Sequence, residues 1–175
     1  RLLAALEALP DQVAEVLAAE AAVGTVAGEI AKCGNIFFVG RAAGHAVAME
    51  GALKLKEVSY LHAEAYPASE LKHGPLALID AHTPTIVVLP RDALFQKNLS
   101  TIAEIRARRG PIYVVTQPGP LPAGVQGALQ VPACEPELDP ILLNIPLQLL
   151  AYRVARERGT EIDQPRNLAK SVTVE

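Results

Sequence analysis

The sequence is poor in aromatic residues, cysteine and clustered positive charge. Aromatics make up 4% of the 175 residues, and tryptophan is absent. The two cysteines, Cys33 and Cys134, match no metal-ligand spacing, so we expect buried thiols of a cytosolic protein and no metal site. The net charge is −3, and no basic cluster exists beyond Arg106, Arg108 and Arg109. This charge balance argues against nucleic acid as a partner.

Long apolar runs are lacking as well. No run approaches the 18 residues typical of a membrane-spanning helix, and the opening RLLAALEALPDQVAEV does not have the pattern of a signal peptide. We therefore expect no membrane partner and a cytoplasmic location. Half of the residues are hydrophobic, which supports the core of a single domain. The aliphatic, alanine-rich composition suits an α/β protein.

Short apolar runs alternate along the chain with segments of helical periodicity. The runs are typical of buried parallel strands, with a shorter outer strand last: 36–39, 85–89, 111–115 and 128–131. We expect the helices in these places: 2–9 (stopped by Pro10), 11–33, 46–60, 92–110, and a last helix to Arg158 that is kinked at Pro146 or begins there. The polar segment 62–75 is expected to be mostly loop with one helical turn.

Alternating strands and helices imply right-handed crossovers and a three-layer α/β/α, Rossmann-like fold with a parallel sheet. Ligands of such sheets bind outside the carboxyl ends of the strands. We therefore expect the turn 40–44 and the start of the next helix at that edge. Glu50 and Glu57 would then follow one wall of the crevice.

The predicted helix 46–60 carries charge on an apolar seam. Glu50, Lys54 and Glu57 are spaced i, i+4 and i+7, which places them on one narrow stripe. The positions that border this stripe are apolar: Ala46, Leu53, Val47 and Val58. The ordinary polar side of the helix is expected elsewhere, around these residues: Ala52, Lys56 and Ser59.

Two interpretations of the stripe remain open on periodicity alone. Glu50 and Lys54 could form a surface pair worth roughly 0.3–0.5 kcal/mol. Alternatively, the stripe borders a cleft, where partial burial tunes the pKa values of acid, base and amine for proton transfer. The turn GRAAG at 40–44 is only a weak phosphate-binding signal, and residues 89–92 lack the hydroxyls and glycine amides that hold a sugar phosphate.

Two longer segments match a known family. EGALKLKEVSYLHAEAYPASELKHGPLALID (Glu50–Asp80) and DQPRNLAKSVTVE (Asp163–Glu175) resemble the isomerase part of the glucosamine-6-phosphate synthase family. The resemblance covers the whole chain and implies the second of two sugar isomerase (SIS) domains, residues 1–175. It also implies that residues 160–175 form an active-site tail. The upstream SIS and glutaminase domains of that family have no counterpart in this sequence.

The resemblance implies a role for each site residue. Lys170 would form an imine with the keto carbon of fructose-6-phosphate, and Glu57 would move a proton between carbons 1 and 2. His73 would open the sugar ring in the site of a neighbouring subunit, which implies a homodimer. Lys54 would lie beside the carbon-5 hydroxyl, and Glu50 would position the other groups.

Ala169, next to the imine-forming lysine, would contact the substrate in the same family. No cofactor is implied. The glutaminase domain would supply the ammonia that reaches the sugar, and the product would be glucosamine-6-phosphate. Two alternatives stay open: a fructosamine-6-phosphate deglycase on the same fold, and a non-catalytic sugar-phosphate sensor. A sensor does not need Lys170, Glu57 and His73 together, and the closing segment 163–175 resembles the synthase.

Overall fold

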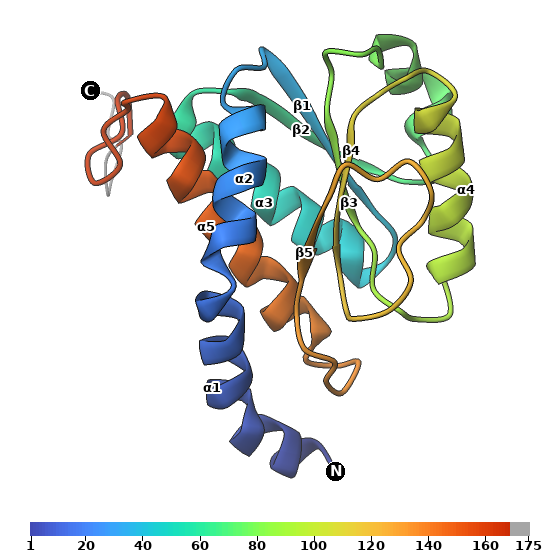
Figure 1. Cartoon of the computed structure of the whole chain (residues 1–175), viewed down its shortest axis with the longest axis vertical. Helices are drawn as coiled ribbons and strands as arrows, with labels where there is room; N and C mark the ends of the chain where they lie inside the picture. Colours follow the sequence, from blue (N-terminus) through green and yellow to red (C-terminus); the bar gives the residue numbers. More distant parts are fainter. Residues whose placement is uncertain (169–175) are drawn as a thin grey trace, which may run out of the picture.

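The computed structural model describes residues 1–168 and shows five parallel strands with helices on both faces (Figure 1). The strand order is β2-β1-β3-β4-β5. The predicted three-layer α/β/α fold is confirmed. The elements run in this order: α1 (Leu2–Ala18), α2 (Glu20–Ile30), β1 (Asn35–Gly40), α3 (Ala43–Ser59), β2 (His62–Pro67), the 3₁₀ helices η1 (Leu71–His73) and η2 (Pro75–Leu78), β3 (Thr85–Val88), α4 (Phe95–Arg106), β4 (Ile112–Thr116), β5 (Gly127–Gln130) and α5 (Asp139–Glu157).

The two faces of the sheet have separate cores because successive strand residues point in opposite directions. On one face Ile36 and Phe38 of β1 pack with residues of α2, α3 and α5. On the other, Phe37 and Val39 pack with α4 and with Leu71 of η1. Figure 1 shows α4 on one side of the sheet and the α2, α3 and α5 group on the other. The helix α3 and the segment η1 therefore lie on opposite faces.

The segment 62–75 was expected to be mostly loop with one helical turn; the turn is present as η1, but the first six residues are not loop. Residues His62–Pro67 form the edge strand β2, paired in parallel with β1 from Asn35↔His62 to Gly40↔Pro67. Its sequence, HAEAYP, has little β-propensity, and only Ala63 is fully buried. Pro67 is tolerated because it ends an edge strand, where one side makes no ladder hydrogen bonds. Pairing with β1 overrides the weak local preference.

Two prolines predicted to limit helices lie inside them. The first helix was expected to stop at Pro10, but α1 continues to Ala18. Pro10 is exposed, so the carbonyl that it leaves without a partner can bond to water. In α5, Pro146 lies within Asp139–Glu157, and Pro140 stands in the first turn, where no amide partner is needed. Within residues 1–168 no helix is both long and apolar enough to cross a membrane.

Candidate active site

The predicted charged stripe exists on α3 as a chain of ion pairs. The Lys54 ammonium lies 2.8 Å from Oε2 of Glu57 and 4.0 Å from Oε1 of Glu50. The three side chains are 42%, 37% and 30% exposed, from Glu50 through Lys54 to Glu57. The hydrogen bond to Glu57 raises the pKa of Lys54, and both carboxylates add to that shift. Lys54 is therefore a fixed cation that orients the carboxylate of Glu57.

The opposite side of α3 is buried, which corrects one expectation. Ala52 is 2% exposed and Ser59 is fully buried, although both were assigned to the polar side of the helix. The Ser59 hydroxyl donates to the carbonyl of Leu55 at 2.6 Å, so its polar group is satisfied. Small residues on this face allow close packing: a Cβ on Gly51 would lie 2.6 Å from Leu147 of α5. The close contact with α5 leaves the charged stripe on the outer side of the helix.

Glu57 was expected at the carboxyl edge of the sheet, but it does not lie there. The helix α3 starts beside the end of β1 and runs back across the sheet, so its last turn reaches the amino edge. There Glu57 lines a groove of about 570 Å³ together with Tyr60, Leu61 and His62. The turn at residues 40–44 does lie at the carboxyl edge, at the opposite end of α3. The turn 40–44 and Glu57 were expected to line one crevice, and this expectation was wrong.

The end of the described tail forms the other wall of this groove. Arg166, Asn167 and Leu168 line it opposite Glu57. The backbone N–H of Arg166 donates to the Tyr60 hydroxyl at 2.9 Å, and its guanidinium carbon lies 4.2 Å from the centre of the Tyr60 ring. Ala169 and Lys170, the predicted substrate contact and imine-forming lysine, lie outside the described residues. Leu168, the residue that precedes Ala169 in the sequence, lines this groove.

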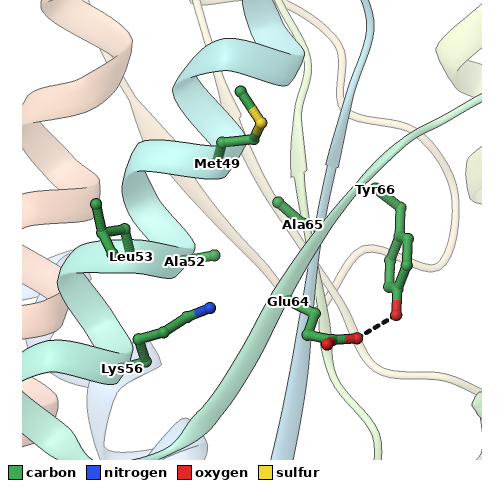
Figure 2. Close-up of a pocket in the computed structure, with 7 residues that line it drawn as sticks. All are labelled: Met49, Ala52, Leu53, Lys56, Glu64, Ala65 and Tyr66. Atoms are coloured by element: carbon green, nitrogen blue, oxygen red, sulfur yellow. Dashed lines mark hydrogen bonds between the residues drawn. The ribbon is translucent and has the colours of Figure 1, made fainter.

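A second groove, of about 430 Å³, lies between α3 and the edge strand β2 (Figure 2). Met49 and Leu53 of α3 face Ala65 of β2 there, and they are 50% and 42% exposed. The Tyr66 hydroxyl donates to the carboxylate of Glu64, which raises the pKa of Tyr66 to about 12. The two grooves meet, because Leu53 and Lys56 line both.

His73 is separated from Glu57 within one chain. It ends η1, is exposed, and follows β2 on the face of the sheet that α4 covers. Glu57 lies on the other face, near the start of β2, and six strand residues span about 20 Å. One copy of the described chain therefore cannot bring His73 and Glu57 to one substrate.

The carboxyl edge of the sheet is filled by side chains of the protein itself. The Arg91 guanidinium donates to the carbonyls of Gln117 at 3.2 Å and Pro120 at 2.8 Å, and it lies 5.0 Å from the Phe95 ring centre. Gln117 accepts from the Arg91 backbone N–H and donates to Asp139 at 2.9 Å. Gly119 is needed beside them, because it has a φ of +144° and a Cβ there would lie 2.5 Å from Arg91. This network ties together the loops that follow β3 and β4 at the carboxyl edge.

The two cysteines are free and partly buried. Burial raises the pKa of both thiols, that of Cys134 to about 12, where a hydrogen bond to Asp139 adds to the effect. Neither is therefore a nucleophile at neutral pH. Among residues 1–168 no three His, Cys, Asp or Glu side chains come together in a group that could hold a metal ion.

The sequence analysis did not single out Tyr60 or Arg166 for the groove. Tyr60 follows the last helical residue and Arg166 lies in a tail without core periodicity, so no local pattern marks either. Lys56, which lines both grooves, was assigned only to the polar side of the helix. A tyrosine three residues after a charged stripe would have been the only hint.

Comparison with known proteins confirms the resemblance found in the sequence. The SIS domain family model matches residues 29–158. The chain is 44% identical to a glutamine–fructose-6-phosphate aminotransferase (isomerizing) of Caulobacter vibrioides, over 100% of this chain and 29% of that protein. With the Bordetella pertussis protein of the same name it is 49% identical, over 99% of this chain and 29% of that one. The chain thus spans less than a third of these relatives and matches their C-terminal part.

A solved structure shows the same arrangement of elements. It is the C-terminal domain of glucosamine-fructose-6-phosphate aminotransferase from Francisella tularensis, with a TM-score of 0.86 and 37% identity. The superposition covers 91% of this chain and 45% of the Francisella chain. Fold and sequence therefore point to the same group of proteins.

Proposed function

Since the chain belongs to the SIS domain family, we propose that it is the C-terminal isomerase domain of a glutamine–fructose-6-phosphate aminotransferase. In this proposal the domain contributes to conversion of fructose-6-phosphate and ammonia into glucosamine-6-phosphate. The observation that carries it is Glu57, paired with Lys54, in a groove whose other wall is the base of the C-terminal tail. The proposal includes the homodimer and the cytoplasmic location that the resemblance implies.

The chemistry needs an amine and a carboxylate close together. The Lys170 amine adds to the keto carbon of the open-chain sugar and releases water, which leaves an imine at carbon 2. Ammonia displaces the lysine and stays on carbon 2 as the new nitrogen. The protonated imine then draws electrons from the carbon 1 C–H bond, which makes that hydrogen acidic.

Glu57 is the base in this scheme. Its carboxylate removes the proton from carbon 1, which leaves an enamine, and returns it to carbon 2. The carbon 1 hydroxyl loses its proton and the nitrogen gains one, which yields an aldehyde at carbon 1 and an ammonium group at carbon 2. Lys54 supports this role, because it stays protonated and fixes the orientation of the Glu57 carboxylate at 2.8 Å. Glu50, 4.0 Å from the same ammonium, holds Lys54 from its other side.

Ring opening is assigned to His73 of a second copy. The cyclic sugar has no free carbonyl, so an acid/base must first open it, and a loop histidine suits that work near neutral pH. The position of His73 on the opposite face from α3 supports a site shared between two copies. The whole-chain match to aminotransferases favours this function over a deglycase or a sugar-phosphate sensor.

Borohydride trapping tests the proposal. Reduction in the presence of fructose-6-phosphate should convert the imine into a stable secondary amine, which peptide mapping would locate at Lys170 of the full-length aminotransferase. Lys170→Arg is the matched control and should abolish the adduct. We expect only traces in the 175-residue chain alone, because the phosphate grip is supplied by another domain. An adduct at Lys54 or Lys56 would overturn the assignment.

A further inference from the structure

We propose that Tyr60 is a positioning residue of this site, which holds the base of the C-terminal tail, residues 166–168, in the groove that Glu57 lines. This role rests on the function proposed above. Tyr60 lies three residues after Glu57, where α3 ends, and it lines the same groove. Figure 1 shows the tail beside the end of α3.

The backbone of Tyr60 is unusual for a tyrosine. It caps α3 in the left-handed conformation, with φ 58° and ψ 18°, and its N–H donates to the carbonyl of Lys56 at 3.2 Å. Glycine is the usual residue in such a cap, because a Cβ is strained there. A large side chain in this conformation persists only when its surroundings hold it, and such positions concentrate at functional sites.

The side chain of Tyr60 binds the tail in two ways. Its hydroxyl accepts the backbone N–H of Arg166 at 2.9 Å, and its ring lies 4.2 Å from the Arg166 guanidinium carbon. The first contact fixes the path of the tail backbone. The second is a cation–π contact that covers the ring face. Both contacts join residues 106 positions apart in the sequence.

Tyr60 is the last hydrogen-bonded anchor before Lys170 in the part of the chain that the structure describes. Upstream, the Arg158 side chain donates to the carbonyl of Ser59 at 2.9 Å, and the Thr160 hydroxyl donates to that of Val58 at 2.6 Å. From residue 161 to residue 168 the remaining hydrogen bonds are local: Asp163 to Glu161 and Leu168 to Pro165.

The position of the anchor sets the length of chain between it and Lys170. Lys170 is four positions after Arg166, at most about 14 Å of extended chain, and ten positions after Thr160, at most about 35 Å. The effective concentration of a tethered group falls roughly as the −3/2 power of tether length. Loss of the Tyr60 anchor should therefore lower the local concentration of Lys170 about fourfold, before any loss of orientation.

A purely structural role for Tyr60 predicts a different result. If Tyr60 only caps α3, its replacement would lower stability and leave the rate of imine formation per folded molecule unchanged. Arg166→Ala would then have no effect on trapping, because Arg166 plays no part in ending the helix. The two roles are therefore separable by measuring trapping and unfolding on the same variants.

The test compares borohydride trapping in four variants of the full-length aminotransferase. Tyr60→Leu should slow trapping at Lys170 by about 4- to 10-fold, since it removes both contacts to the tail. Arg166→Ala keeps the backbone N–H that the Tyr60 hydroxyl accepts and loses only the cation–π contact, so about a threefold loss is expected. Tyr60→Phe keeps the ring and loses only the hydroxyl, so about a threefold loss is expected. Arg156→Ala is the matched control: Arg156 also lies over a tyrosine ring, that of Tyr152 at 5.9 Å, but within α5. It should trap at the rate of the unmodified protein.

A double-mutant cycle decides whether the two residues act as one unit. Tyr60→Leu combined with Arg166→Ala should be no slower than Tyr60→Leu alone, because the leucine already lacks both contacts to Arg166. Normal trapping in Tyr60→Leu, or multiplicative losses in the double variant, would overturn the positioning role and leave the proposed function intact. Failure of the unmodified protein to trap at Lys170 would instead overturn the proposed function, and the role of Tyr60 with it.

Discussion

At the carboxyl edge of the sheet, the Arg91 guanidinium is bonded to two carbonyls of its own chain and lies against Phe95. At the amino edge, Glu57 is bonded to Lys54, keeps 30% of its side-chain surface exposed and faces a groove. The first network joins the loops that follow β3 and β4. The second network joins residues of one helix, and that helix does not depend on the ion pair to form. Polar groups that hold loops together and polar groups available for chemistry thus lie at opposite ends of the same sheet.

The comparison shows at which edge of this sheet polar side chains remain exposed. Open parallel sheets usually bind ligands at their carboxyl edge. In the proposed function this domain uses the side of a crossover helix instead, while the loops at its carboxyl edge are bonded to one another. Four predictions test this contrast by turnover or by unfolding.

Glu57→Gln should give the largest effect. Removal of a positioned general base typically lowers the rate by about 10²–10⁴-fold. The amide keeps the size and hydrogen-bonding capacity of the side chain, so the loss should appear in kcat of the full-length aminotransferase and leave KM nearly unchanged. Glu50→Gln is the matched control and should lose less, because Glu50 acts through Lys54. Near-normal turnover by Glu57→Gln would move the proton transfer to another group.

Mixed dimers should recover activity that each variant lacks. If His73 serves the site of its partner, a heterodimer of one Glu57→Gln subunit and one His73→Asn subunit contains one fully native site. Heterodimers purified through two different tags should therefore reach about half of the normal turnover, while both homodimers stay low. Recovery would require that the part of one copy that carries His73 meets the edge of the other copy that carries Glu57. Inactive heterodimers would show that His73 and Glu57 do not share a site across a dimer.

Arg91→Met should affect stability and not turnover. The change removes two side-chain hydrogen bonds between loops and should lower the free energy of unfolding by about 1–2 kcal/mol. Urea denaturation of the 175-residue chain measures this directly, with Arg108→Met as an exposed control that bonds within its own helix turn. The corresponding full-length variant should keep its kcat. A selective loss of sugar-phosphate affinity would show that the carboxyl edge takes part in binding after all.

Lys54→Met should give the smallest change in stability. The pair with Glu57 is exposed and lies within one helix, so its loss should cost less than about 0.5 kcal/mol. The folded pKa of Lys54 is raised, so the contribution is complete below the unfolded value of 10.5 and disappears as the pH rises through the folded value. Unfolding curves of the two proteins should therefore converge at strongly alkaline pH. A difference that grows with pH would contradict this assignment of the Lys54 proton.

The sequence predicted the features that depend on composition and strong periodicity. The buried strands β1, β3 and β4 were found because both of their faces are covered and their residues are continuously apolar. The Glu50, Lys54 and Glu57 stripe was found because helical spacing alone brings those side chains together. Neither feature needs information from distant parts of the chain.

What the sequence could not show depends on contacts between distant segments. The strand β2 exists because β1 provides a pairing partner, and the burial of Ala52 and Ser59 follows from the packing of α3 between the sheet and α5. Glu57 lies at the amino edge because α3 runs back across the sheet, and that direction depends on how the helix packs on the strands. The Tyr60–Arg166 contact spans 106 positions and leaves no local signal.

The central place of α5 also affects how the chain folds during synthesis. Leu142, Leu143, Leu147 and Leu150 complete the core on the face that α2 and α3 share, yet they belong to the last helix to be made. At about 5–20 residues per second, the 19 residues of α5 take roughly one to four seconds to emerge. During that time the apolar surface of β1 and α3 stays open to other chains. We expect nascent chains stalled before Asp139 to bind chaperones, and that binding to end once α5 is released.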